Sequence, residues 1–428
     1  MAKLNELGAR EAARRLAARD ITVEQLARAC LERVQAREAV VGAWIHLDPE
    51  AVLAQAKRLD AGPVRGPLHG LPIGVKDIID TADMPTGYGS KVYADTRTAM
   101  DAAGVALARA AGALIFGKTV STEFAWFHPG KTANPRVPEH APPHTPGGSS
   151  SGSAAAVADD MVPLAFGTQT AGSIVRPGGY CGIVGYKPSY GTLPRMGVKM
   201  LAESLDTLGV MARSPGDAGL LVGALSGRDL LPRDLGRAPR IALCRTYEWP
   251  AALPETAAAL DRAAKAAAKA GAQVKELALP KDFAGLLQAQ IDLMNYESYR
   301  SLASDRLHHW DGLSETLKKL LDAASRVSAA RYDEARALAA KCRAMLGDVF
   351  ADADAILAPT APGEAPKGLQ ATGDPVFCRV WTLLGTPSMN VPCSQGPNGL
   401  PVGVQIIGRI GDDARAISVA EWLQEKLA

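Results

Sequence analysis

Short apolar runs alternate with helix-compatible segments along the first half of the chain, and this alternation limits the folds open to it. The apolar runs that predict buried strands are 71–75, 113–116 and 162–167. The segments among them with helical composition are 105–111 and 154–158. Strands that alternate with helices favour an α/β fold, so we expect a sheet with helices on both faces.

Strands and helices also alternate in the remainder of the chain, where helices take a larger share of the residues. We expect amphipathic helices over 3–19 and 22–38, and Thr22 followed by Gln25 is typical of a helix start. Further helices are expected over 257–270, most of 283–350, and 412–428. Further strands are expected over 273–277, 354–358 and 402–407. We find no internal repeat and no stretch that divides the molecule cleanly.

Composition and charge exclude several classes of protein. The formal net charge is +2, which gives no electrostatic case for binding nucleic acid. No run of about 18 apolar residues occurs, and charged residues interrupt the N-terminal segment, so we expect neither a membrane span nor a secretion signal. The six cysteines are widely spaced without a C-x-x-C pair, which favours buried thiols in a reducing compartment. We therefore expect a cytoplasmic protein.

Three literal motif matches are weakened by their surroundings. The segment 112–119 fits the P-loop pattern, but its variable positions are apolar and predict a strand rather than a phosphate-binding loop. Ser150 lies in a G-x-S-x-G match, yet a proline-rich segment precedes it where a nucleophile elbow needs a strand. His140 and His144 have the spacing of a metal pair on a helix, but prolines between them prevent that helix. We expect no metal and no cofactor.

Three longer motifs occur in order and carry a more specific signal. Gly74-Val-Lys-Asp77 follows an apolar run, and Gly147-Gly-Ser-Ser-Ser-Gly-Ser153 precedes a row of alanines. The third motif is Gly167-Thr-Gln-Thr-Ala-Gly-Ser-Ile-Val-Arg-Pro177. Together they resemble the amidase signature family of serine hydrolases. The resemblance is densest over 44–225 and returns near the C-terminus.

The resemblance implies a fold and an activity. It implies a single amidase domain over 1–428 with a mixed, twisted sheet, a signature core at 44–225 and a helical region at 230–350 that shapes the substrate pocket. The implied reaction is cleavage of a carboxylic amide to an acid and ammonia or an amine. The implied partner is a small-molecule amide, with no nucleic acid and no membrane. A homodimer is common in such enzymes and is a further hypothesis.

The resemblance also assigns roles to individual residues. Lys76 matches the base, Ser149 the bridging serine and Ser173 the nucleophile. A serine hydroxyl is a weak nucleophile until a base takes its proton, and burial lets a lysine act as that base by lowering its pKa. In the family the peptide bond at the bridging serine is cis. The backbone amides of the turn form the implied oxyanion hole at Thr170, Ala171, Gly172 and Ser173.

The segment around Ser173 differs from the commoner sequence of the family, and the differences concern substrate binding. Gln169 stands where an aspartate is common, Ala171 replaces a glycine, and Arg176 lies three residues after the serine instead of two. Gln169 and Arg176 are therefore candidate substrate-binding residues. Arg176 could bind a substrate carboxylate, which suggests a small acid amide, or it could brace the loop through backbone carbonyls. The alternative function is the glutaminase subunit of a tRNA-dependent amidotransferase.

Overall fold

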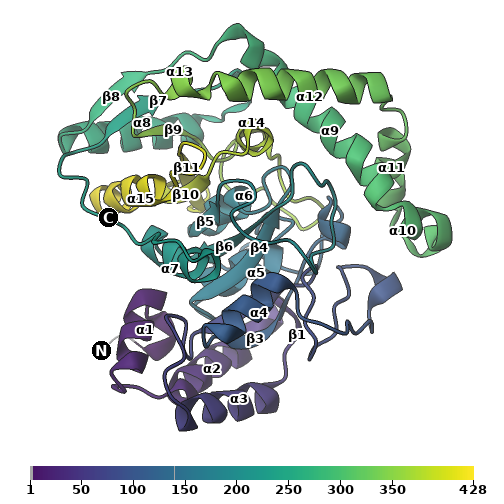
Figure 1. Ribbon diagram of the computed structural model, residues 1–428, viewed down its shortest axis with the longest axis vertical. Helices are drawn as coiled ribbons and strands as arrows, with labels where there is room; N and C mark the ends of the chain where they lie inside the picture. The colour runs from purple at the N-terminus through teal and green to yellow at the C-terminus, as the bar shows by residue number, and fades with distance from the viewer. Residues whose placement is uncertain (1–2, 139) are drawn as a thin grey trace.

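A single mixed β-sheet runs through the computed structural model, which describes residues 3–138 and 140–428 (Figure 1). Its strands in the described residues are β1 (Trp44–His46), β2 (Pro72–Lys76), β3 (Leu114–Thr119), β4 (Leu164–Gln169), β5 (Val184–Lys187), β6 (Thr207–Ala212), β7 (Arg240–Leu243), β8 (Gln273–Glu276), β9 (Ala355–Pro359), β10 (Ser388–Gln395) and β11 (Pro401–Ile407). Their order across the sheet is β1-β3-β2-β4-β6-β5-β10-β11-β9-β7-β8. Strands β3, β2 and β4 are parallel, and so are β9, β7 and β8. The other neighbouring pairs are antiparallel.

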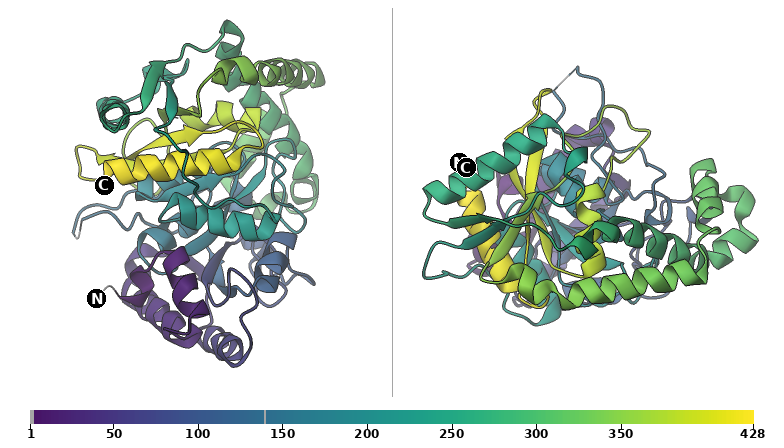
Figure 2. Two further views of the ribbon diagram at one scale, coloured as in Figure 1. Left: turned by 60° about the vertical axis from the view of Figure 1, so that its left-hand side comes forward. Right: turned by 90° about the horizontal axis from the view of Figure 1, so that it is seen from above.

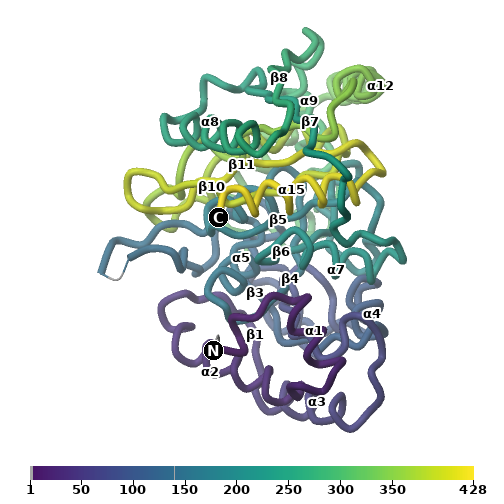
Figure 3. The backbone as a smooth tube through the Cα atoms, turned by 90° about the vertical axis from the view of Figure 1, so that its left-hand side faces the viewer, coloured from purple at the N-terminus to yellow at the C-terminus, as the bar shows by residue number. Residues whose placement is uncertain are grey.

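Helices cover both faces of this sheet, as the sequence predicts. Among the described residues they are α1 (Ala9–Ala17), α2 (Val23–Val41), α3 (Pro49–Ala61), α4 (Ala103–Ala110), α5 (Ser151–Ala158), α6 (Val175–Cys181), α7 (Pro215–Ser226), α8 (Pro254–Lys269), α9 (Leu286–Ser301), α10 (Ala303–His308), α11 (Glu315–Ala324), α12 (Ala329–Ala344), α13 (Leu346–Phe350), α14 (Val376–Leu384) and α15 (Asp413–Leu427). Helix α15 packs against α7 and α8, and the three lie on the same side of the molecule (Figure 3). Helices α5 and α6 pack against each other and against the sheet. The α/β fold class is confirmed.

Local signals place the ends of several elements. The Thr22 hydroxyl accepts from the Gln25 amide, and the Gln25 side chain accepts from the Thr22 amide, so the predicted capping box begins α2. Strands β2, β3 and β4 are buried at every position, as central parallel strands require. The glycine, lysine and threonine of the P-loop match fall inside β3, at 117–119, so no phosphate-binding loop forms there.

The predicted helical stretch after residue 283 forms an arm at one side of the molecule. Helices α9 to α12 extend away from the sheet in Figure 1 and in the right-hand view of Figure 2. Helices α9 and α12 pack against α14, and Leu293, Met294 and Trp381 belong to one buried apolar cluster there. This cluster also contains Ala171, so the arm and α14 reach the motif that contains Ser173.

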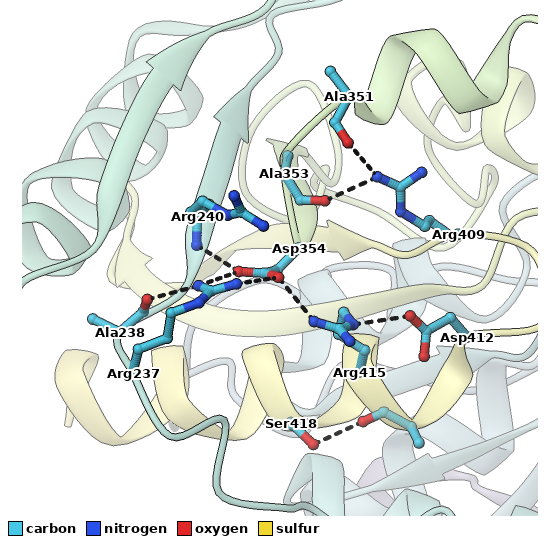
Figure 4. Close-up of polar contacts among 11 residues, drawn as sticks. Arg237, Ala238, Arg240, Ala351, Ala353, Asp354, Arg409, Asp412, Arg415 and Ser418 are labelled. Carbon is cyan, nitrogen blue, oxygen red and sulfur yellow. Dashed lines mark hydrogen bonds and ion pairs between the residues drawn. The ribbon is translucent and has the colours of Figure 1, made fainter.

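An ion cluster centred on Asp354 joins β7 and β9, two strands near the β8 edge of the sheet (Figure 4). The carboxylate is buried and accepts from both Nη atoms of Arg237 at 2.7 and 2.9 Å, and from the Arg240 amide at 2.8 Å. Arg415 of α15 donates to it at 2.9 Å. One side chain therefore links the segment before β7, the start of β9 and the last helix.

Two exclusions made from composition can be compared with the structure. All six cysteines are buried and none forms a disulfide, as their spacing predicts. Within 3–138 and 140–428, no helix combines the length and apolar character needed to cross a bilayer.

Candidate active site

Parallel pairing of β2 with β4 decides where Lys76 lies. Ile73 pairs with Leu164 and Gly74 with Ala165, so both strands end at the same edge of the sheet. Lys76 is the last residue of β2, and the third motif begins as β4 ends. Motifs about 90 residues apart in sequence therefore meet at the carboxyl ends of neighbouring parallel strands, where α/β proteins place their ligands.

The Lys76 side-chain nitrogen is fully buried between two hydroxyl groups. Its Nζ lies 2.7 Å from Ser149 Oγ and 2.8 Å from Thr168 Oγ1. Burial lowers the pKa of Lys76 well below its usual value, and the nearby Asp206 carboxylate opposes this only in part. Lys118 is buried too, but it forms an ion pair with Asp77 at 3.7 Å. Lys76 forms no ion pair within the described part of the chain, so no direct partner there offsets the effect of burial, which favours the neutral amine.

The Gly/Ser run is fixed on β4 by its own hydroxyl groups. The peptide bond between Gly148 and Ser149 is cis, and Gly147 has a φ of 82°, a conformation that favours glycine. Ser150 Oγ lies 3.3 Å from both the amide and the carbonyl of Thr168. Ser150 is thus held by backbone, and the serine that meets Lys76 is Ser149.

Ser173 lies in the turn between β4 and α6. It keeps 7% of its surface exposed, and its hydroxyl has no hydrogen-bond partner among the described residues. The Gln169 side chain holds this turn in place. Its Oε1 accepts from the Ile174 and Val175 amides at 2.8 and 3.0 Å. Its Nε2 donates to Thr382 Oγ1 at 2.9 Å. Gln169 is buried and acts as a helix cap, so its contacts are with the protein itself.

The same turn directs its carbonyl groups away and leaves amides free. The Thr170 carbonyl accepts from Gln290 Nε2 at 2.9 Å, and the Ala171 carbonyl accepts from Thr382 Oγ1 at 2.7 Å. The four amides of the predicted oxyanion hole, those of Thr170, Ala171, Gly172 and Ser173, donate to no group of the described residues. Free amides next to a serine are what an oxyanion hole requires.

Glycine is needed in the turn because α14 lies against it. A Cβ on Gly172 would lie 2.7 Å from Pro375 Cβ and 3.0 Å from Cys378 Cβ. Thr170 Oγ1 donates to the buried Asp206 carboxylate on the other side of the turn. The turn is therefore packed between two parts of the protein, and its amides keep a fixed direction.

Arg176 is enclosed by backbone. Its Nη1 donates to the Gly373 carbonyl at 2.6 Å, and its Nη2 donates to the Gly148 carbonyl at 2.5 Å and to Thr372 Oγ1 at 3.1 Å. The side chain is 1% exposed, and burial lowers the pKa of its guanidinium. Of the two roles considered for Arg176, these contacts fit the one in which it braces the loop through backbone carbonyls. The arginine connects the Gly/Ser run to the segment before α14. A contact between Arg176 and substrate stays a prediction.

The remaining sequence candidates do not form a site of their own. His144 Nδ1 lies 2.7 Å from the Ala365 carbonyl, while His140 stands in an exposed turn with a φ of 71°. No group of three or more His, Cys, Asp or Glu side chains that could hold a metal exists in the described residues.

Sequence reasoning missed four residues of this site. Thr168 contacts Lys76, Thr382 and Gln290 hold the turn, and Arg379 on α14 donates to Gln290 Oε1. Thr168 lies within the third motif and could have been found by extending the strand register. The others come from helices far along the chain and carry no local pattern.

Comparison with known proteins shows which family the chain belongs to. A family model described as Amidase matches residues 25–417. A subunit of the glutamyl-tRNA(Gln) amidotransferase of Chloroflexus aurantiacus is 32% identical and aligns with 99% of this chain and 97% of its own length. A solved structure described as an amidase has a TM-score of 0.90 at 31% identity, covering 99% of this chain and all of that one.

A further solved structure, the peptide amidase of Stenotrophomonas maltophilia, has a TM-score of 0.82 at 28% identity and covers 99% of this chain and 97% of that one. Family model, relatives and structures agree along nearly the whole sequence. The chain belongs to the amidase family and is a hydrolase that acts on C–N amide bonds.

Proposed function

We propose that this amidase works through an acyl-enzyme on Ser173, with Ser149 and Lys76 as the proton relay. The observation that carries the proposal is the 2.7 Å contact between Ser149 Oγ and a buried Lys76 amine of lowered pKa. A neutral amine at that distance can take a proton from the serine hydroxyl, which is the activation a serine nucleophile needs.

The proposed reaction has two halves, acylation of Ser173 and its hydrolysis. Ser173 Oγ attacks the amide carbonyl carbon and gives its proton to Ser149, whose own proton passes to Lys76. Negative charge on the carbonyl oxygen is stabilised by the free amides of the turn, where one donor contributes about 3–4 kcal/mol. Ser149 then returns a proton to the nitrogen, and ammonia or an amine leaves. Water attacks the acyl-enzyme with the same relay, and the acid is released.

The test is ammonia release from small amides together with labelling by a serine-reactive fluorophosphonate. Ser173→Ala should abolish both turnover and labelling. Ser149→Ala should slow turnover by several decades, whereas the control Ser151→Ala, in the same run, should stay near the wild-type rate. Full activity in Ser173→Ala would refute the mechanism. Addition of a chelator should leave the rate of turnover unchanged. Inhibition by a chelator that zinc reverses would make a metal site at His140 and His144 a candidate again.

A second candidate function rests on the curated relatives. Several that are 32–35% identical over nearly the whole chain are named as one of the subunits of a glutamyl-tRNA(Gln) amidotransferase. The chain would then hydrolyse glutamine and pass on the ammonia only when bound to partner subunits. Turnover of small amides by the purified chain alone favours the stand-alone amidase. A chain that is labelled at Ser173 but releases no ammonia from any amide, glutamine included, favours the amidotransferase role.

Oligomeric state is part of the same proposal. A stand-alone enzyme of this kind is proposed to be a homodimer acting on a small molecule. Light scattering on the purified chain measures the mass directly, and a value near the 44.8 kDa of one chain would contradict the dimer.

A further inference from the structure

A buried arginine without a carboxylate partner lies next to the turn that carries Ser173. Arg379 belongs to α14, is 8% exposed, and forms no ion pair with any described residue. Burying a charged group costs several kcal/mol unless another group compensates it. Among the described residues Arg379 has the Gln290 Oε1 acceptor and the Phe127 ring, whose centroid lies 6.0 Å from its Cζ, but no carboxylate bound to it.

Helix α14 presents Arg379 on the face that touches the turn. Pro375 and Cys378 limit the space at Gly172, and Thr382 donates to the Ala171 carbonyl. Arg379 follows Pro375 by four residues and precedes Thr382 by three, so helical spacing puts it on the same face. Gln290 completes the link. It accepts from Arg379 Nη1 and donates to the Thr170 carbonyl at 2.9 Å.

The two buried arginines near the turn differ in how many of their N–H donors remain without an acceptor. Both Nη atoms of Arg176 have protein acceptors, and its Nε is sealed from solvent. Arg379 uses only Nη1; its Nε and Nη2 have no partner in the described residues, yet they are not sealed. Arg379 therefore offers two adjacent N–H donors to a small molecule, and Arg176 offers none.

Arg379 keeps its positive charge, and it is influenced by one carboxylate, Asp374, and by a second cation, Arg176. Burial lowers the pKa of Arg379 to about 10, Asp374 raises it and Arg176 lowers it, so the guanidinium stays charged at neutral pH. Asp374 is exposed at the start of α14 and its Oδ1 accepts from the Val376 amide. Two cations thus lie close together with no carboxylate bound to either.

We propose that Arg379 binds a carboxylate of the substrate, and that the preferred substrates are acid amides with a free carboxylate a few bonds from the amide that is cleaved. A carboxylate matches the two parallel donors of a guanidinium edge, so it would fix the orientation of the amide carbonyl toward Ser173. Gln290 is a positioning residue that holds Arg379 relative to the turn. This inference rests on the proposed function and names its substrate class.

The experiment compares two amides that differ only in charge. Succinamate carries the carboxylate, and succinamide replaces it with a neutral amide of the same shape. Wild type should have the higher kcat/KM on succinamate. Arg379→Met, which keeps much of the side-chain volume, should lose roughly 10- to 150-fold on succinamate, the range for charge-assisted hydrogen bonds, and little on succinamide. Arg379→Lys keeps the positive charge but lacks the two parallel N–H donors. Its kcat/KM on succinamate should therefore lie between those of wild type and Arg379→Met.

A matched control and a binding measurement make the result decisive. Arg343→Met removes another arginine that holds α14, through the Leu383 and Leu384 carbonyls, and should leave the succinamate preference unchanged. Succinate itself, titrated by calorimetry, should bind wild type and lose affinity in Arg379→Met by a similar factor. Circular dichroism and fluorophosphonate labelling of each variant confirm that the fold and the serine are intact.

The outcomes separate the two proposals. Equal losses on succinamate and succinamide, or unchanged succinate binding in both Arg379 variants, would overturn the role of Arg379 while the amidase mechanism stands. Absence of turnover and labelling in wild type would overturn the mechanism. In that case, loss of succinate binding in Arg379→Met still supports a carboxylate site at α14.

Discussion

Replacing Asp354 with asparagine tests whether the ion cluster that joins β7 and β9 stabilises the fold. Burial by itself raises the pKa of the Asp354 carboxyl, but hydrogen bonds from Arg237, the Arg240 amide and Arg415 outweigh it and lower the pKa to about 2. Asparagine keeps the size of the side chain and removes the charge. The substitution therefore isolates the electrostatic part of the cluster (Figure 4).

The magnitude follows from the difference between the folded and unfolded pKa values. The unfolded carboxyl has a pKa of 3.8, and about 1.4 kcal/mol corresponds to each pH unit of difference, which gives about 2 kcal/mol at neutral pH. Because Arg237 and Arg415 are 44% and 45% exposed, salt screens part of this, and we expect about 1–2 kcal/mol. In a chain of this length that is a fall in Tm of about 1–2 °C.

The pH and salt dependence give the sign of the effect. The folded pKa lies below the unfolded one, so the stabilisation is complete above about pH 4 and is lost as the pH falls toward 2. Calorimetry of wild type and Asp354→Asn should show a Tm difference at pH 7 that shrinks by about half at pH 3 and also in 1 M salt. Asp352→Asn is the control, because Asp352 is exposed two residues away. A Tm difference equal to that of the control, or one independent of both pH and salt, would refute the reasoning.

Three further predictions concern the active site. The pH profile of kcat/KM should rise as neutral Lys76 forms, with a midpoint well below the ordinary pKa of 10.5, and Lys76→Arg should remove the rise together with the activity. Arg176→Met leaves the carbonyls of Gly148 and Gly373 without their donor, so it should lower Tm and reduce kcat/KM equally on succinamate and succinamide; a selective loss on succinamate would place it at the substrate. Gln169→Met removes the acceptor of two turn amides and should cost about 1–3 kcal/mol in urea unfolding together with a lower kcat, whereas an unchanged kcat would show that the cap does not hold the turn.

Local chemistry in the sequence predicted many of the elements and indicated the residues proposed for the relay. Apolar runs gave the positions of β2, β3 and β4 within a few residues, because a strand buried on both faces is a continuous apolar run. The order of three motifs was enough to show the resemblance from which the proposed roles of Lys76, Ser149 and Ser173 come. The elements that were not predicted include strands β1, β5, β6, β7 and β10 and helices α3 and α14. Strands as short as β1 and β7 have too few residues to show a pattern of their own, so pairing with neighbouring strands decides them.

Only the tertiary structure decided which groups meet. Register between β2 and β4 puts Lys76 between Ser149 and Thr168, and Arg176 proves to be bound by backbone carbonyls from distant segments. Arg379 lies more than 200 residues after Ser173 and reaches its turn through Gln290. A sequence determines periodicity and propensity over short windows, whereas a side chain's partner depends on how remote elements pack, and that is settled by burial summed over the whole core.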